Sequence, residues 1–177
     1  VEDITLSIIP YVESKNINIV FDTYIEELEI RCDPESMERV ILNLLSNAIK
    51  FTNNAGNISV IVEADDKYVF IRVKDDGIGI SKDIREDIFN RFVQEDKSLN
   101  RKNEGSGIGL ALVKSLVELH DGEVYLEDVS EGSEFVVKLP NIKINEEVNN
   151  HNRVMEVESK PLVQKINIEF SDIYELY

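Results

Sequence analysis

The feature that most constrains the fold of this chain is the stretch 33–52, which has the pattern of one long helix. Asp33 is a favoured N-cap residue, and Pro34 suits the first helical position. The apolar residues that follow recur with the helical period and form one broad face: Met37, Val40, Ile41, Leu44, Leu45, Ala48 and Ile49. The sequence therefore predicts a long amphipathic helix that ends near Thr52.

The opposite stripe of this helix has an unusual composition, with Arg39, Asn43, Ser46, Asn47 and Lys50 falling together. Asparagine is a poor helix former that favours caps and turns, so two of them one turn apart need a reason. One interpretation is an amide stripe that holds a hydrated cation and a charged ligand. The other is an ordinary polar face, and the stripe alone does not decide between them.

Composition excludes several classes of protein. The 177 residues fit one domain with a sizeable core, and the net charge of −16 opposes attraction to nucleic acid or to an anionic membrane surface. Cys32 is the single cysteine, which excludes an intrachain disulfide and fits a reducing compartment. No apolar run approaches the ~20 residues of a membrane helix, and the chain opens without Met, so we expect a fragment of a longer protein.

The remaining pattern alternates between helical and strand periods. Helices are predicted at 3–15 (kinked by Pro10), 81–91 and 108–120, and strands at 17–21, 28–32, 58–64, 68–74, 123–127 and 134–139. The helix at 108–120 is apolar around most of its circumference and should be largely buried, with a left-handed Gly122 after its end. These elements predict an α+β fold, a sheet with helices on one face.

Two segments lack such periodicity. Residues 93–107 are polar, charged and punctuated by glycine, which predicts a mobile loop. Residues 141–164 have the composition of a linker, and beyond them Ile166, Ile168 and Phe170 alternate on one apolar side. That short tail is either a strand added to a sheet edge or a disordered end, and the sequence leaves both open.

Three further motifs follow the long helix. Asp75-Asp76-Gly77-Ile78-Gly79-Ile80 ends a predicted strand, Ile88-Phe89-Asn90-Arg91-Phe92 contains a Phe-x-x-Phe box, and Gly105-Ser106-Gly107-Ile108-Gly109-Leu110 opens a helix. Glycines let the backbone turn sharply and approach a ligand, and exposed amides at a helix N-terminus bind phosphate. A hairpin turn and a flexible linker are the plainer interpretations. The spacing does not fit a dinucleotide-binding fingerprint, and no P-loop motif occurs.

With the stretch Asn43 to Thr52, these motifs resemble, in order and spacing, the catalytic ATP-binding domain of sensor histidine kinases, which are related to gyrase, the Hsp90 chaperones and the mismatch-repair ATPases. The resemblance covers about residues 1–140 and implies a Bergerat-type α/β sandwich with a mixed, mostly antiparallel sheet; 141–177 would be a C-terminal linker and apolar tail. It implies transfer of the γ-phosphate of ATP to a histidine on a separate dimerisation domain, and a response regulator downstream. The module would be a cytoplasmic domain, and the resemblance leaves open whether its parent protein is anchored in a membrane.

The resemblance also assigns roles to residues. Asn47 matches the Mg²⁺ ligand, with Asn43 as a second ligand or water holder, and Asp75 rather than Asp76 matches the acceptor of the adenine amino group. Asn43, Asn47 and Lys50 would form the catalytic set. The nucleotide-binding set is Asn43, Asn47, Lys50, Phe51, Asp75, Gly77, Gly79, Ile80, Arg91, Gly105, Ser106, Gly107, Ile108, Gly109 and Leu110. Lys97, Arg101 and Lys102 are further candidates for the phosphates, while Gln94 stands where the family often has Arg.

Position 43 favours a kinase over a hydrolase. ATPase relatives place a Glu there to activate water, and the amide of Asn43 is not a general base. The same position argues against a serine kinase of the anti-sigma-factor type, whereas a nucleotide-binding scaffold without transfer activity stays open. Neither His120 nor His151 has the setting of a phosphoacceptor, so we interpret both as structural or incidental and expect the acceptor histidine outside this chain.

Overall fold

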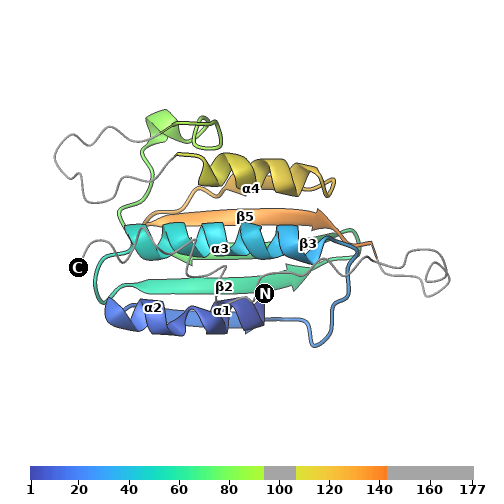
Figure 1. Cartoon of the computed structure of the whole chain (residues 1–177), viewed down its shortest axis with the longest axis horizontal. Coiled ribbons are helices and arrows are strands. Elements are labelled where there is room, and N and C mark those ends of the chain that lie inside the picture. Colours follow the sequence, from blue (N-terminus) through green and yellow to red (C-terminus); the bar gives the residue numbers. More distant parts are fainter. Residues whose placement is uncertain (94–106, 143–177) are drawn as a thin grey trace.

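In the computed structural model of the chain, residues 1–93 and 107–142 are described, and five strands form one sheet in the order β1-β2-β3-β5-β4. The strands are β1 (Asn18–Thr23), β2 (Asn57–Ala64), β3 (Tyr68–Asp75), β4 (Glu123–Leu126) and β5 (Ser133–Pro140). The helices are α1 (Glu2–Ser7), α2 (Ile9–Ser14), α3 (Pro34–Phe51), the 3-10 turn η1 (Lys82–Ile84) and α4 (Gly109–Glu118). Figure 1 shows α3 lying along the sheet.

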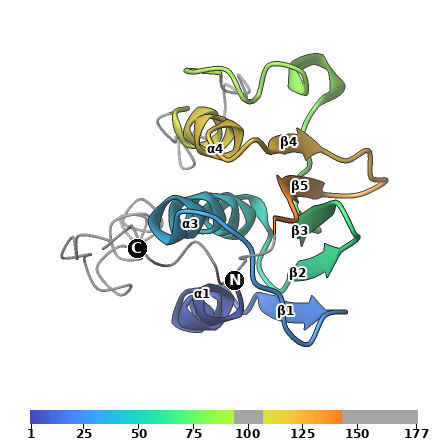
Figure 2. The same ribbon diagram turned by 90° about the vertical axis from the view of Figure 1, so that its right-hand side faces the viewer.

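The sheet is mixed and mostly antiparallel, as predicted. β1 runs parallel to β2, whereas β2–β3, β3–β5 and β4–β5 are antiparallel pairs. Figure 2 shows α1, α3 and α4 side by side on one face of the sheet. The architecture is therefore a two-layer sandwich, and the predicted fold class is confirmed.

The long helix α3 forms the centre of the core. Its first turn is capped by Asp33, whose side chain accepts a hydrogen bond of 3.0 Å from the backbone N–H of Ser36. Its apolar face packs on the sheet with Ile41, Leu44, Leu45 and Ile49 fully buried. Leu42, which the periodicity assigned to no face, is equally buried, because α4 packs against α3 from the side.

The N-terminal helix is broken as Pro10 predicted. α1 ends at Ser7, Ile8 lies between the two helices, and Pro10 lies in the first turn of α2, where the missing N–H costs no helical hydrogen bond. Ile8 and Val12 point into the core, so the break leaves the packing against α3 intact.

Two of the expected elements are wrong. Residues 28–32 form no strand, although β1 lies at an edge of the sheet; the Arg31 N–H instead donates to the carbonyl of Ile142, just beyond β5, at 3.1 Å. The helix expected at 81–91 is reduced to η1 and the turns after it. Backbone N–H groups here donate to the carbonyl three residues earlier, as Asp87 does to Ile84, which is the 3-10 and turn pattern and not the α-helical one. Ile88 still points inward, as expected.

The end of α4 also differs from expectation. Only Ala111, Val113 and Val117 are buried in this helix, and Leu119 is 78% exposed, because α3 and β4 cover just one side of it. The left-handed residue after the helix is Asp121 (φ 54°) and not Gly122. Glycine is required at 122 for space, since an added Cβ would lie 2.6 Å from the Lys138 carbonyl oxygen.

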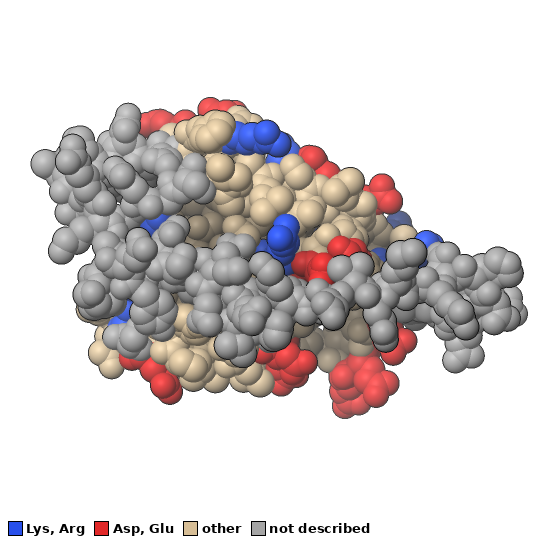
Figure 3. Space-filling model, viewed as in Figure 1, with Lys and Arg blue, Asp and Glu red and all other residues tan. Residues whose placement is uncertain are grey.

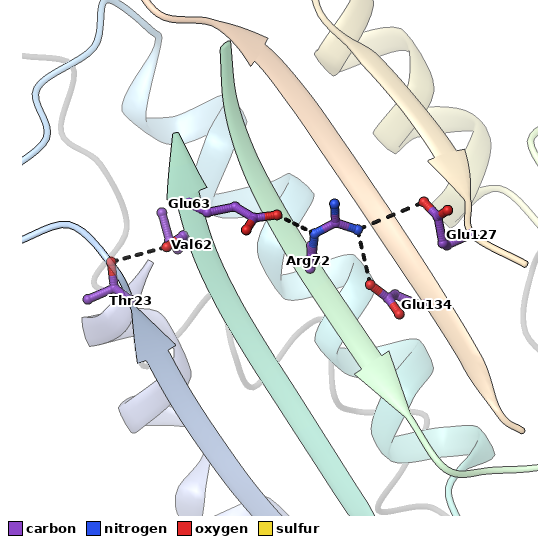
Figure 4. Close-up of polar contacts among 6 residues, drawn as sticks. All are labelled: Thr23, Val62, Glu63, Arg72, Glu127 and Glu134. Carbon is purple, nitrogen blue, oxygen red and sulfur yellow. Dashed lines mark hydrogen bonds and ion pairs between the residues drawn. The ribbon is translucent and has the colours of Figure 1, made fainter. Parts of the chain in front are cut away.

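The face of the sheet opposite the helices carries a cross-strand charge ladder (Figure 4). Arg72 on β3 contacts Glu63 on β2 at 2.6 Å, Glu134 on β5 at 3.1 Å and Glu127 at 3.8 Å. These contacts raise the pKa of the Arg72 guanidinium, chiefly through the hydrogen bond to Glu63. Figure 3, which views the molecule as Figure 1 does, shows many of the acidic side chains at the edges of this face, with uncharged residues and a few Lys and Arg side chains between them.

Candidate functional site

The asparagine stripe of α3 is not a solvated face. Asn43 is only 7% exposed, and its Nδ2 donates to the Arg39 carbonyl of its own helix at 3.0 Å. Its Oδ1 faces the start of α4, where an added Cβ at Gly109 would lie 2.6 Å from that oxygen. The amide of the stripe and the glycine motif therefore meet, and a larger residue at 109 would separate them.

The C-terminal part of the stripe is half-buried. Asn47 lies one turn after Asn43, and Lys50 lies in the last turn of the helix with its Nζ 5.6 Å from the centroid of the Phe51 ring. A cation in the last turn is favoured by the helix dipole. This end of α3 thus carries one amide, one ammonium group and one aromatic ring within five residues.

Asp75 occupies the end of β3 and is only 4% exposed. Burial raises the pKa of its carboxyl to about 6; the hydrogen bond from the Gly77 N–H opposes this shift, and the neighbouring charge of Asp76 adds to it. The Gly77 N–H donates to Oδ1 of Asp75 at 2.9 Å. A buried carboxyl at a strand end, aligned by the glycine turn, is a specific hydrogen-bonding group for a ligand.

Asp76 has a different environment from Asp75. Its two oxygens accept hydrogen bonds from the backbone N–H (2.8 Å) and the side-chain amide (2.7 Å) of Asn57, and these bonds hold the pKa of Asp76 below its usual value. Asp76 therefore joins the end of β3 to the start of β2. The structure leaves Asp75, and not Asp76, as the buried member of the pair.

Glycines bring the Asp75 turn against two other segments. An added Cβ at Gly77 would lie 2.3 Å from the Phe51 carbonyl oxygen, which also accepts the Ile78 N–H at 3.3 Å. Gly132, before β5, has φ +69°, and a Cβ there would fall 1.8 Å from the Asp75 carbonyl oxygen. This contact was not predicted from the sequence, where the signal was a glycine shortly before a predicted strand.

The Phe-x-x-Phe box and the glycine motif are joined at their facing ends. The Phe92 N–H donates to the Gly107 carbonyl at 2.9 Å, and both residues have positive φ (65° and 66°). Arg91 and Phe92 are exposed. Of the other expected site residues, Ile80 and Leu110 are half-buried against the core and Ile108 is exposed. Gly105, Ser106 and most of the predicted loop, with Gln94, Lys97, Arg101 and Lys102, lie outside the described residues.

His120 has a structural role that the sequence did not specify. Its Nε2 accepts the backbone N–H of Asp33 at 2.9 Å, and its Nδ1 lies 2.7 Å from the Leu116 carbonyl oxygen. Since Nε2 accepts, Nδ1 carries the proton and donates to Leu116. The imidazole therefore joins the end of α4 to the residue that caps α3, and both ring nitrogens are engaged.

Two further observations bear on ligand type. A cleft of about 570 Å³ beside the β2–β3 hairpin is lined by Glu27, Glu29, Asp65 and Asp66, whose charge is wrong for a polyphosphate. Within residues 1–93 and 107–142, no group of three or more His, Cys, Asp or Glu side chains could hold a metal ion.

Residues 32–143, more than half of the chain, match the family model of the histidine kinase-, DNA gyrase B- and HSP90-like ATPases. The chain therefore belongs to this ATPase family, as the motifs indicated. Histidine kinase P4 of Formosa agariphila is 35% identical over 143 residues, which is 78% of this chain and 10% of that protein. The circadian input-output histidine kinase CikA of Synechococcus elongatus is 41% identical over 111 residues, 62% of this chain and 15% of that protein. The chain thus spans a small part of the curated relatives it matches.

Solved structures of histidine kinases share the fold. The catalytic domain of histidine kinase ThkA aligns with a TM-score of 0.71 at 24% identity, covering 80% of this chain and 92% of that domain. Full-length ShkA, solved in complex with AMPPNP, aligns with a TM-score of 0.70 at 28% identity, covering 81% of this chain and 30% of ShkA.

In the described ranges, none of the helices has the length and apolar character needed to cross a membrane.

Proposed function

We propose that this chain is the ATP-binding catalytic module of a sensor histidine kinase, which transfers the γ-phosphate of ATP to a histidine on a separate dimerisation domain. The observation that carries the proposal is the arrangement around α3. Its carboxyl end touches the Gly77 turn beside the buried carboxyl of Asp75, and Asn43, two turns earlier, touches the glycine start of α4. One helix thus supports both a base-binding end and a phosphate-binding end.

Each part of this site has a chemical role in the proposal. Asp75 accepts a hydrogen bond from the adenine amino group, and the glycines at 77 and 79 let the backbone approach the base. The amides at the start of α4 face the phosphates, where a helix N-terminus favours negative charge. Lys50 and Arg91 add positive charge in an otherwise acidic molecule.

Magnesium fits the same site. Mg²⁺ prefers oxygen ligands and keeps several waters, so one or two amide oxygens together with phosphate oxygens suffice. Asn43 Oδ1 faces the glycine motif in a space that a Cβ at Gly109 would fill, and Asn47 follows one turn later on the same stripe. We therefore assign Asn47 as a ligand, with Asn43 as a second ligand or water holder. When bound, the ion supplies neutralising charge for the phosphates.

Transfer rather than hydrolysis follows from position 43. The Asn43 side chain has no basic atom, and its Nδ2 is already bonded to the Arg39 carbonyl, so it cannot deprotonate an attacking water. The residues of this site instead position the nucleotide and stabilise its charge. A histidine-bearing dimerisation domain and a response regulator are the proposed partners, 1–140 the proposed catalytic domain, and 141–177 the proposed linker and tail.

The test is phosphotransfer in trans. The chain is incubated with γ-labelled ATP and Mg²⁺, with and without the dimerisation domain of the parent protein, and acid-labile label is measured on each polypeptide. We expect label on the added domain and none on this chain, since His120 is bonded at both nitrogens. Label on this chain alone that is lost in His120→Ala would contradict the proposal, as would binding of ATP without transfer to the supplied histidine.

A further inference from the structure

Lys15 lies at a joint between two helices. Its backbone forms the C-cap of α2, and its Nζ donates a hydrogen bond of 2.8 Å to the Ile49 carbonyl, in the last turn of α3 and 34 positions further along the chain. The final carbonyls of a helix have no donor within the helix, and the helix dipole favours a cation beside them. One lysine therefore ends α2 with its backbone and completes the end of α3 with its side chain.

The ammonium group of Lys15 is partly withdrawn from water. The residue is half-buried, and burial lowers the pKa of the ammonium below its usual value. Two backbone hydrogen bonds strengthen the same joint: the Ala55 N–H donates to the Lys15 carbonyl at 3.3 Å, and the Asn18 N–H donates to the Gly56 carbonyl at 2.9 Å. The segment 15–18 thus holds both the end of α3 and the turn that follows it.

The end of α3 that Lys15 holds carries the proposed nucleotide site. Asn47 and Lys50 belong to this part of the helix. At the last helical residue, the Phe51 carbonyl accepts the Ile78 N–H at 3.3 Å, in the glycine turn of the base-binding end. Because helix ends fray, opening of the last turn would displace the groups assigned to the phosphates and those assigned to the base together.

We propose that Lys15 is a positioning residue of the nucleotide site and that it couples the N-terminal helices α1 and α2 to that site. With the bond to Ile49 in place, the last turn of α3 keeps the site in its binding geometry, and without the bond that turn opens more readily. A nucleotide that needs the ordered turn binds the first state more tightly, and by linkage it favours the docking of α1 and α2 in return. This inference rests on the proposed function, because it assumes that nucleotide binds at this end of α3.

Three variants separate the hydrogen bond from stability in general. Lys15→Met keeps the long side chain and removes the donor, whereas Lys15→Arg keeps a cationic donor. Val124→Ala removes buried volume on β4, at the opposite edge of the sheet from β1, and is the control for instability alone. ADP affinity with Mg²⁺ is measured by calorimetry, and the melting temperature without nucleotide is measured in parallel.

The affinities should divide the variants. We expect Lys15→Met to bind ADP about tenfold more weakly than the parent, and Lys15→Arg to bind it within about twofold. Val124→Ala should melt as low as Lys15→Met or lower, and it should keep the parental affinity. Parental affinity in Lys15→Met, or an equal loss of affinity in Val124→Ala, would overturn the inference.

Hydrogen exchange tests the reciprocal half of the proposal. Saturating Mg-ADP should slow amide exchange in α1 and α2 of the parent beyond any general slowing that β4 shows, although neither helix contributes a residue to the proposed site. Lys15→Met should lose this extra protection, and Val124→Ala should keep it. Equal extra protection in Lys15→Met and the parent would overturn the coupling.

Two outcomes need their own arms. If Lys15→Met does not fold, Lys15→Gln takes its place in both measurements, because its amide nitrogen stands one bond short of the position of Nζ. A parent that binds no ADP would instead overturn the proposed function itself.

Discussion

At the scale of single residues, Asp75 has opposite effects on stability and on binding. Its pKa is about 6 in the fold, against an ordinary value of 3.8, and burial is the main cause. The fold therefore favours the protonated acid. The stability that this group contributes is fully present below pH 3.8 and is lost as the pH rises through 6. At neutral pH the ionised carboxylate destabilises the empty protein, while it is the form needed for the proposed hydrogen bond from adenine.

Asp75→Asn should accordingly stabilise the empty protein at pH 7.5 and weaken nucleotide binding. The amide still accepts the Gly77 N–H without a buried charge, so the free energy of unfolding should rise by up to about 3 kcal/mol. The gain should shrink as the pH falls towards 4.5, because the parental carboxyl is then protonated in the fold. Urea unfolding at both pH values measures this, with Asp66→Asn on the surface as control. An equal gain at both pH values would show that ionisation of Asp75 is not the cause.

Asn47→Ala should remove most of the Mg²⁺ dependence of ATP binding, since its amide oxygen is the proposed ligand. The residue is half-buried on a helix and Ala favours helix, so the fold should persist. Calorimetric titration with ATP, with Mg²⁺ and with chelator, gives the dependence directly. Asn54→Ala, at an exposed asparagine of the following turn, is the matched control. If ATP binding by Asn47→Ala responds to Mg²⁺ as it does in the parent, Asn47 is not a ligand of the ion.

At the scale of elements, the connection that leads into β5 is packed closely against the Asp75 turn. Gly132→Ala should destabilise the protein by several kcal/mol, because a Cβ falls 1.8 Å from the Asp75 carbonyl oxygen and φ is +69°. Nucleotide affinity should fall in the same variant, since the Asp75 turn must move. Ser130→Ala, in the same connection and exposed, serves as the control. Thermal melts and ADP titration check both effects. A Gly132→Ala variant with the melting temperature and ADP affinity of the parent would show that the turn can move to accommodate the added Cβ without measurable cost.

Elements defined by local pattern could be predicted from the sequence. α3 has both a cap at Asp33 and a strict apolar period, and the β2–β3 hairpin joins two alternating runs over a short polar turn. Residues 28–32 alternate just as well and yet pair with none of the five strands, although β1 and β4 lie at the edges of the sheet, so alternation alone does not decide pairing. Leu119 is apolar but is 78% exposed, on a side of α4 that none of the elements in the described part of the chain covers.

The candidate site shows the same limit. Motifs indicated Asn43, Asp75 and Gly109 separately, but the contact between Asn43 and Gly109 joins residues 66 positions apart and depends on how α4 packs on α3. The role of His120 as the acceptor of the Asp33 N–H likewise joins the two helices. Gly122 illustrates a subtler error, because a glycine after a helix indicates a left-handed residue, whereas the crowding by β5 that requires it here is invisible in the local sequence.

At the scale of the whole molecule, the end of the catalytic domain can be tested by truncation. Asn141 donates from its backbone to the Lys67 carbonyl at 2.8 Å and from its side chain to the Asp65 carbonyl at 2.7 Å, and Ile142 accepts the Arg31 N–H at 3.1 Å. A chain ending at 142 should therefore melt within a few degrees of the full chain, and one ending at 139 should melt lower. A large loss on removing 143–177 alone would instead place the apolar tail in the folded domain.

The parallel pairing of β1 with β2 has a consequence for how the chain folds. The two strands are separated by the whole of α3, while β2 and β3 are neighbours across a short turn. Closing a long loop delays a contact, so we expect the hairpin and α3 to associate early and β1 to join late. Truncating Val60 to Ala should then slow folding, whereas Ile19→Val should chiefly speed unfolding. Stopped-flow chevrons of these two variants would measure the order, and slower folding in Ile19→Val alone would reverse it.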